Sequence, residues 1–125
     1  MSSKQELIET VRQEKQDVDL FIIGNQALVF DNAKEVIKAA GDTAVISYSK
    51  APIIEGALGG FVPDDEKLGK MLADSVIEVL VEGKNIKMIP YKVDDNPMLI
   101  INAKALERYQ LTIPENVKSR VKFIN

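Results

Sequence analysis

The sequence predicts an α/β fold, a Rossmann-like sheet with helices on both faces in three layers. Short apolar runs rich in branched residues alternate with segments of helical periodicity along the chain. Such alternation is typical of a sheet with right-handed crossovers. The chain has 125 residues, 46% of them hydrophobic, which is enough for one domain with a buried core. We therefore predict a single domain over residues 1–125.

The first half of the chain predicts two strands and two helices. Residues 4–16 carry one apolar stripe among charges, the pattern of a short amphipathic helix. The uninterrupted apolar run 18–24 predicts a strand covered on both faces. Residues 25–41 predict a second helix with Gly41 as its C-cap, and residues 43–49 predict the next strand, followed by a turn.

The middle of the chain predicts a glycine-weakened strand and the strongest helix. Residues 56–62, "GALGGFV", form the third predicted strand, although glycine reduces packing there. Apolar residues then repeat at helical spacing over residues 65–82, and Gly83 ends this helix. Residues 86–93 predict a further strand, placed at an edge by Pro90.

The C-terminal segment predicts a strand and two short helices. Residues 98–101 are apolar and branched, as expected of a strand. Asn102 is a natural N-cap for a helix over residues 103–109, and Pro114 suits the first turn of a last helix. The lysines near the end of the chain predict a solvated face.

The glycine-rich stretch "GALGGFVPDDEKLGK" precedes a helix, as a phosphate-binding loop would. The helix N-terminus is occupied by Asp64, Asp65 and Glu66, which complement the helix dipole and would repel a phosphate. The stretch also lacks the Gly-Lys-Ser/Thr ending of a phosphate loop. The acids predict helix capping in preference to a metal site or an acid/base pair, and "VDDNP" (residues 93–97) predicts a turn.

Composition favours binding over chemistry. The chain has neither cysteine nor histidine, which removes thiol nucleophiles, the usual zinc ligands and the commonest general base. We expect a protein that is not an enzyme and that has no metal or cofactor. Its net charge of −3 and scattered basic residues argue against nucleic acid as a partner. The polar N-terminus does not predict a signal peptide, and no apolar run predicts a membrane span.

Residues that follow the predicted strands are the candidate ligand contacts, because ligands of open α/β sheets bind beyond the carboxyl ends of the strands. These residues are Gly24, Asn25 and Gln26 after the first strand, Tyr48 and Ser49 after the second, and Val62, Pro63 and Asp64 after the third. Other roles remain open. Asn25 and Gln26 also suit a turn and a helix N-cap, and Tyr48 also suits a half-buried core position.

The order of elements resembles the C-terminal part of the substrate-binding proteins of ABC transporters, in the tryptophan/tyrosine-type group. The resemblance rests on "VDLFIIGNQ", "AVISYS", "EGALGGFVPDDEKLGKMLADSVIEVLVEGKN" and above all "INAKALERYQLTIPENV". It implies one lobe of a type I periplasmic-binding-protein-like fold plus a crossover helix. It implies ligand contacts at Asn25, Gln26, Tyr48, Ser49, Pro63 and Asp64. At position 49, relatives often carry an aspartate where this chain has serine.

The resemblance implies reversible binding of a small, amino-acid-like solute. The protein would serve an ABC permease as the binding component of an importer, or a receptor as its sensor domain. Either role implies a location outside the cytoplasm. The alternative is a self-associating interaction module that has lost ligand binding. The apolar face of the helix over residues 65–82 leads us to expect a homo-oligomer, unless this face folds back on the sheet.

Overall fold

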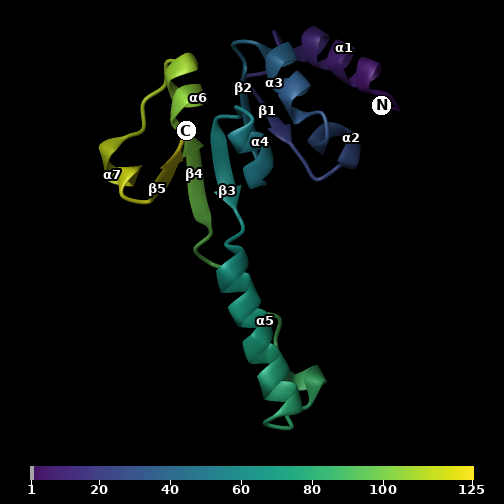
Figure 1. Ribbon diagram of the computed structural model, residues 1–125, viewed down its shortest axis with the longest axis vertical. Coiled ribbons are helices and arrows are strands. Elements are labelled where there is room, and N and C mark those ends of the chain that lie inside the picture. Colours follow the sequence, from purple (N-terminus) through teal and green to yellow (C-terminus); the bar gives the residue numbers. More distant parts are fainter. Residues whose placement is uncertain (1) are drawn as a thin grey trace. The chain divides into compact units, whose positions relative to one another are not determined.

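The computed structural model describes residues 2–125, which divide into two compact units (Figure 1). Unit 1 comprises Met1–Val62 and Met98–Asn125, and unit 2 comprises Pro63–Pro97. The single domain expected over residues 1–125 stays a prediction, and the two units are described separately.

Unit 1 contains all five strands and most of the helices. Its elements are α1 (Lys4–Glu14), β1 (Leu20–Ile23), α2 (Ala27–Phe30), α3 (Ala33–Ala40), β2 (Ala44–Ser47), α4 (Lys50–Ile54), β3 (Gly59–Val62), β4 (Met98–Asn102), α6 (Ala103–Arg108), α7 (Glu115–Lys118) and β5 (Val121–Ile124). Strands and helices alternate through most of the chain, so the predicted α/β class is confirmed.

The sheet is mixed, with its strands in the order β1-β2-β3-β4-β5. Strands β1, β2 and β3 run parallel, and β5 runs parallel to β4. The β3–β4 pair is antiparallel and ends at Val62 opposite Met98. The carboxyl ends of β1, β2 and β3 therefore share one edge of the sheet, as the site prediction requires.

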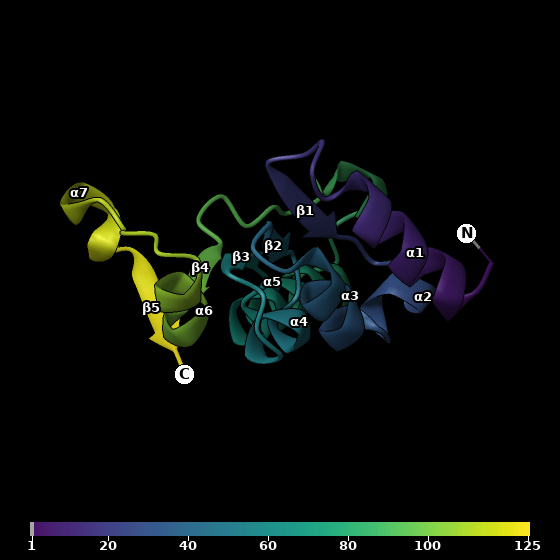
Figure 2. The same cartoon turned by 90° about the horizontal axis from the view of Figure 1, so that it is seen from above.

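The core of unit 1 lies between the sheet and a layer formed by α1, α3, α4 and α6, which lie on the same side of the sheet (Figure 2). Ile23 and Val45 point into this core and are 1% and 0% exposed. Their neighbours on the opposite face differ sharply, since Ile22 and Phe61 are each 52% exposed. Unit 1 therefore supplies two of the three predicted layers.

The expectation that the first strand is covered on both faces is wrong for β1. The apolar run is continuous, as in a doubly covered strand, but the side chain of Ile22 remains half exposed. The sequence makes both faces of β1 apolar. Whether a face is buried depends on which other segments pack against it, and none within residues 2–125 buries the face that carries Ile22.

Three further expectations about elements differ from the structure. The helix expected over residues 25–41 is divided into α2 and α3 at Asp31 and Asn32, although Gly41 ends it at a φ of 64°, as predicted. The turn expected after β2 contains the helix α4. No strand forms over residues 86–93, which contain a 3₁₀ turn, η1 (Ile86–Met88), followed by extended chain in which Pro90 lacks an N–H to pair.

Close strand packing explains the paired glycines of "GALGGFV". A Cβ atom at Gly60 would lie 2.0 Å from the backbone oxygen of Ser47 in β2. A Cβ atom at Gly59 would lie 2.3 Å from the backbone oxygen of Ile100 in β4. Real Cβ atoms do not approach backbone oxygens this closely. Positions 59 and 60 of β3 must therefore be glycine for the strand to fit between β2 and β4. These two glycines are explained by close packing within the sheet, without a phosphate-binding role.

Unit 2 consists of the long helix α5 (Asp65–Leu80), η1 and the chain that returns to β4. Asp64 is the N-cap of α5, and its Oδ1 accepts a hydrogen bond from the Lys67 N–H at 3.2 Å, which confirms the capping prediction. Ion pairs join the helix to the returning chain. Lys67 pairs with Asp94, and Glu78 pairs with Lys84 at 3.2 Å and with Lys92 at 2.9 Å.

The Lys67–Asp94 pair predicts that unit 2 loosens in acid. The Lys67 ammonium, with help from the Asn96 N–H, holds the pKa of Asp94 below its usual value. The stabilisation is therefore complete above the unfolded pKa of about 3.9 and is lost as the pH falls through the lower folded pKa. Hydrogen exchange of the α5 amides should accelerate in Asp94→Asn at neutral pH. The variant Asp95→Asn is the control, and equal exchange in both variants would contradict the prediction.

Candidate functional site

The carboxyl ends of β1 and β2 bring two of the predicted loops together. Ile23 and Ser47 are paired in the parallel ladder, so the residues that follow them leave the sheet side by side. Asn25 and Gln26 follow β1, and Tyr48 and Ser49 follow β2. Four of the six predicted contacts therefore lie at adjacent strand ends within unit 1.

The side chains at these positions are free of intramolecular hydrogen bonds within residues 2–125. Gln26 is the N-cap of α2 and Ser49 the N-cap of α4, but neither side chain makes a capping hydrogen bond. Asn25 and Gln26 are exposed. Tyr48 is 53% exposed. The side chains of Gln26 and Ser49 therefore do not cap their helices, whereas the turn role of Asn25 and the half-buried position of Tyr48 stay open.

Ser47 shapes this edge, and sequence analysis did not single it out. Its side chain is buried at the end of β2, and its Oγ accepts a hydrogen bond from the Ser49 N–H at 3.1 Å. This bond fixes the turn on which Tyr48 and Ser49 lie. A serine that ends an apolar strand was the available signal, but only the fold shows that it is buried.

Pro63 and Asp64 follow β3 directly, as predicted, and they belong to unit 2. Asp64 is engaged in capping α5, so its position is explained without a ligand. Their part in a ligand site stays a prediction.

Residues 2–125 hold no group of three or more side chains able to bind a metal ion. None of the helices described for these residues is both long and apolar enough to cross a membrane. The chemistry offered by the loops after β1 and β2 is that of neutral amides and hydroxyls, which can both donate and accept hydrogen bonds. Such groups can orient a polar ligand without reacting with it.

Three solved structures have similar folds. One is a conserved domain protein of Vibrio cholerae, with 23% sequence identity and a TM-score of 0.74. The second is the ligand-free, open structure of a Clostridium difficile substrate-binding protein with adhesive properties, with 19% sequence identity and a TM-score of 0.86. The third is the ABC domain from Streptococcus pneumoniae in complex with L-Trp, with 20% sequence identity and a TM-score of 0.75.

Each similarity covers 100% of this chain but only 43%, 42% and 44%, respectively, of the other chains. The chain therefore spans less than half the length of these relatives. A search of curated proteins gave no match.

The family model for the ABC transporter substrate binding protein matches residues 1–122. This match covers nearly the whole chain and agrees with the resemblance seen in "INAKALERYQLTIPENV". The chain belongs to the ABC transporter substrate-binding protein family.

Proposed function

We propose that this chain forms one wall of a binding site for a small, amino-acid-like solute. The observation that carries the proposal is the cluster of side chains at the ends of β1 and β2, Asn25, Gln26, Tyr48 and Ser49, without hydrogen-bond partners within residues 2–125. They lie where open α/β sheets bind ligands.

The chemistry of the cluster suits a zwitterion. Amide N–H and hydroxyl groups can donate to a carboxylate, while amide and hydroxyl oxygens can accept from an ammonium group. The exposed ring of Tyr48 adds an apolar surface for a side chain of the solute. The L-Trp complex of the Streptococcus pneumoniae relative is consistent with a solute of this class.

Pro63 and Asp64, which belong to unit 2, stay predicted ligand contacts and are not counted in this cluster. The role that follows from family membership is delivery of the solute to an ABC permease, outside the cytoplasm. A sensor domain that reports the same solute to a receptor is the second form of the proposal. Neither form requires a catalytic residue, and we propose that the protein is not an enzyme.

Calorimetric titration of the chain with a panel of amino acids and related small carboxylates tests the proposal. For the solute that binds, Asn25→Ala and Tyr48→Phe should each weaken binding by about tenfold, because each removes a hydrogen bond to a charged or polar group. Both side chains are exposed, so the fold should be unaffected.

Two substitutions of the same type serve as controls. Asn116→Ala changes an exposed asparagine in α7, and Tyr91→Phe removes the hydroxyl of an exposed tyrosine in unit 2. Both should bind as the original chain does. Heat from no member of the panel, or equal losses in site and control variants, would overturn the proposed site and favour an interaction module without a ligand.

A further inference from the structure

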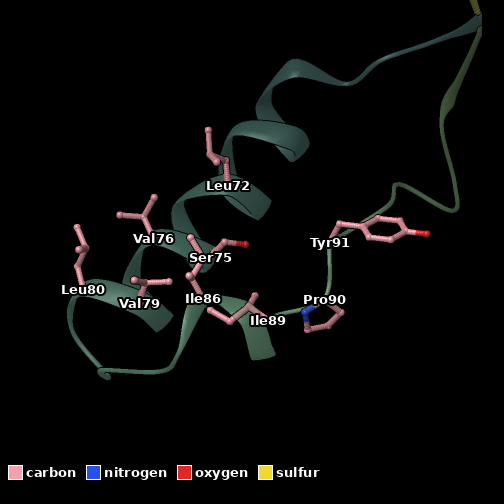
Figure 3. A pocket seen from close by; sticks show the side chains of 9 residues that line it. All are labelled: Leu72, Ser75, Val76, Val79, Leu80, Ile86, Ile89, Pro90 and Tyr91. Atoms are coloured by element: carbon pink, nitrogen blue, oxygen red, sulfur yellow. The ribbon is translucent and has the colours of Figure 1, made fainter.

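The apolar groove of unit 2 is unsuited to an amino-acid-like solute. It lies between α5 and the returning chain, and its volume is about 480 Å³ (Figure 3). Its lining contains no charged residue, and the hydroxyl group of Ser75 already donates to the Met71 backbone oxygen at 3.2 Å. The structure does not show what covers the groove, so the homo-oligomer expected from this face of α5 stays a prediction. The polar groups that suit such a solute are those of the loops after β1 and β2 in unit 1.

The loop after β2 starts from a fixed point of the sheet. Ser47, the last residue of β2, pairs with Ile23 of β1 on one side. On the other side, Gly60 of β3 comes so near that a Cβ atom at position 60 would lie 2.0 Å from the Ser47 backbone oxygen. Ser47 is only 2% exposed, so its hydroxyl group is enclosed by the protein. Both the backbone and the side chain of Ser47 are therefore held by their neighbours.

A hydrogen bond ties the binding residues of this loop to that fixed point. The Ser47 Oγ accepts from the Ser49 N–H at 3.1 Å, which closes a turn with Tyr48 as its middle residue. The Ser49 side chain makes no capping bond to α4 that could hold the turn instead. The conformation of Tyr48 and Ser49 thus depends on a buried hydroxyl group.

We propose that Ser47 is a positioning residue for the solute site, and that its hydroxyl group holds Tyr48 and Ser49 in the binding conformation before the solute arrives. This inference rests on the proposed function, in which Tyr48 and Ser49 contact the solute. A loop that is ordered beforehand loses less of its binding free energy to ordering. Without the hydrogen bond the loop occupies the binding conformation for only part of the time, and the affinity falls by the same fraction. One hydrogen bond of ordinary strength changes that fraction by about twofold to tenfold.

Calorimetric titration with each member of the same panel of amino acids and small carboxylates compares the full original chain with Ser47→Ala. The variant should bind about fivefold more weakly to any member that the original chain binds, because the Ser49 N–H loses its acceptor. Ser47→Cys places a sulfur atom, a weak acceptor, at the same position, so this variant should bind with intermediate affinity. It also replaces the alanine variant if that variant does not fold.

Thr43→Val is the matched control on the same strand. Thr43 lies directly before β2, at the end opposite to Ser47, and its Oγ1 donates to the Lys15 backbone oxygen at 2.9 Å. Valine keeps the shape of threonine but loses this hydrogen bond, so it should lower the stability of unit 1 much as Ser47→Ala does. Its affinity for the same panel member should equal that of the original chain, since the loop after β2 is unchanged.

Hydrogen exchange of the Ser49 amide, measured by NMR without solute, reports on the turn itself. The reference is the Leu58 amide, which donates to the Val45 backbone oxygen at 2.7 Å in the same unit. Relative to this reference, exchange at Ser49 should accelerate about fivefold in Ser47→Ala and stay unchanged in Thr43→Val.

The outcomes separate the positioning role from the function on which it rests. If the original chain binds no member of the panel, the proposed function is wrong and the positioning role falls with it. If the original chain and Ser47→Ala bind equally well, or if Ser47→Ala and Thr43→Val weaken binding alike, the positioning role alone is overturned. An unchanged exchange rate of the Ser49 amide in Ser47→Ala would overturn it as well.

Discussion

Gly60→Ala should destabilise unit 1 by at least about 3 kcal/mol, enough to prevent folding in many conditions. The new methyl group would lie 2.0 Å from the backbone oxygen of Ser47, and backbone cannot yield as the end of a flexible side chain can. Relief requires β3 to move away from β2, which breaks the sheet next to the core residue Val45. Urea unfolding followed by circular dichroism gives the free energy of unfolding.

Gly24→Ala is the control for this prediction. Gly24 also lies in unit 1, but a Cβ atom there meets nothing within 4 Å, and its φ is not in the left-handed region. Its free energy of unfolding should stay within about 0.5 kcal/mol of the original value. If Gly60→Ala were as stable as Gly24→Ala, the conclusion that β3 lies too close to Ser47 of β2 for a side chain at position 60 would be wrong.

Asn102→Ala should cost about 2–4 kcal/mol in the free energy of unfolding. The Asn102 side chain is buried, and its Nδ2 donates to the backbone oxygen of Ile53 in α4 at 2.8 Å. Its Oδ1 accepts from the Ala105 N–H at 3.0 Å and so caps α6. Alanine removes the cap and one of the two hydrogen bonds that the Ile53 oxygen accepts, the other coming from the Gly56 N–H at 3.2 Å.

Two further substitutions separate these contributions. Asn102→Asp keeps the acceptor for the Ala105 N–H but loses the donor to Ile53, so it should remain destabilised. Asn85→Ala removes an exposed N-cap that bonds only the Lys87 N–H, and it should cost about 1 kcal/mol or less. If Asn102→Ala and Asn85→Ala lowered the free energy of unfolding by the same amount, the hydrogen bond from Asn102 to Ile53 would contribute nothing to stability.

Individual helices and strands were predicted from patterns of a few neighbouring residues. The apolar runs around Ile23 and Val45 became strands, and the periodic segment after Asp64 became α5. Asn102 caps α6 as predicted, because capping needs only the side chain and the next three residues. The same local reasoning failed at residues 86–93, since a strand needs a partner and none is paired with them.

The last strand was missed for the opposite reason. Val121–Ile124 contains Lys122 and lies in the lysine-bearing end of the chain that was predicted to be a solvated face, yet it pairs in parallel with β4 along its full length. An edge strand can remain partly exposed, so its sequence lacks the continuous apolar run by which central strands are recognised. Pairing with Met98–Asn102 decided its state.

The positions of the candidate site were readable from the sequence, but the state of its side chains was not. The order of strands predicted that Asn25 and Tyr48 would follow neighbouring strand ends. Whether Gln26 and Ser49 would use their side chains as caps depended on backbone geometry at α2 and α4, and neither does. The buried bond from Ser49 to Ser47 likewise exists only in the fold.

The sequence by itself determined the α/β class, the capping residues and the family, because these depend on composition, on spacing within a few residues and on motif order. The tertiary structure alone decided which apolar surfaces are buried. Ile23 and Ile22 are adjacent and equally apolar, yet one is 1% exposed and the other 52%. Burial depends on what packs against a face, and that partner is set by contacts between residues far apart in the chain.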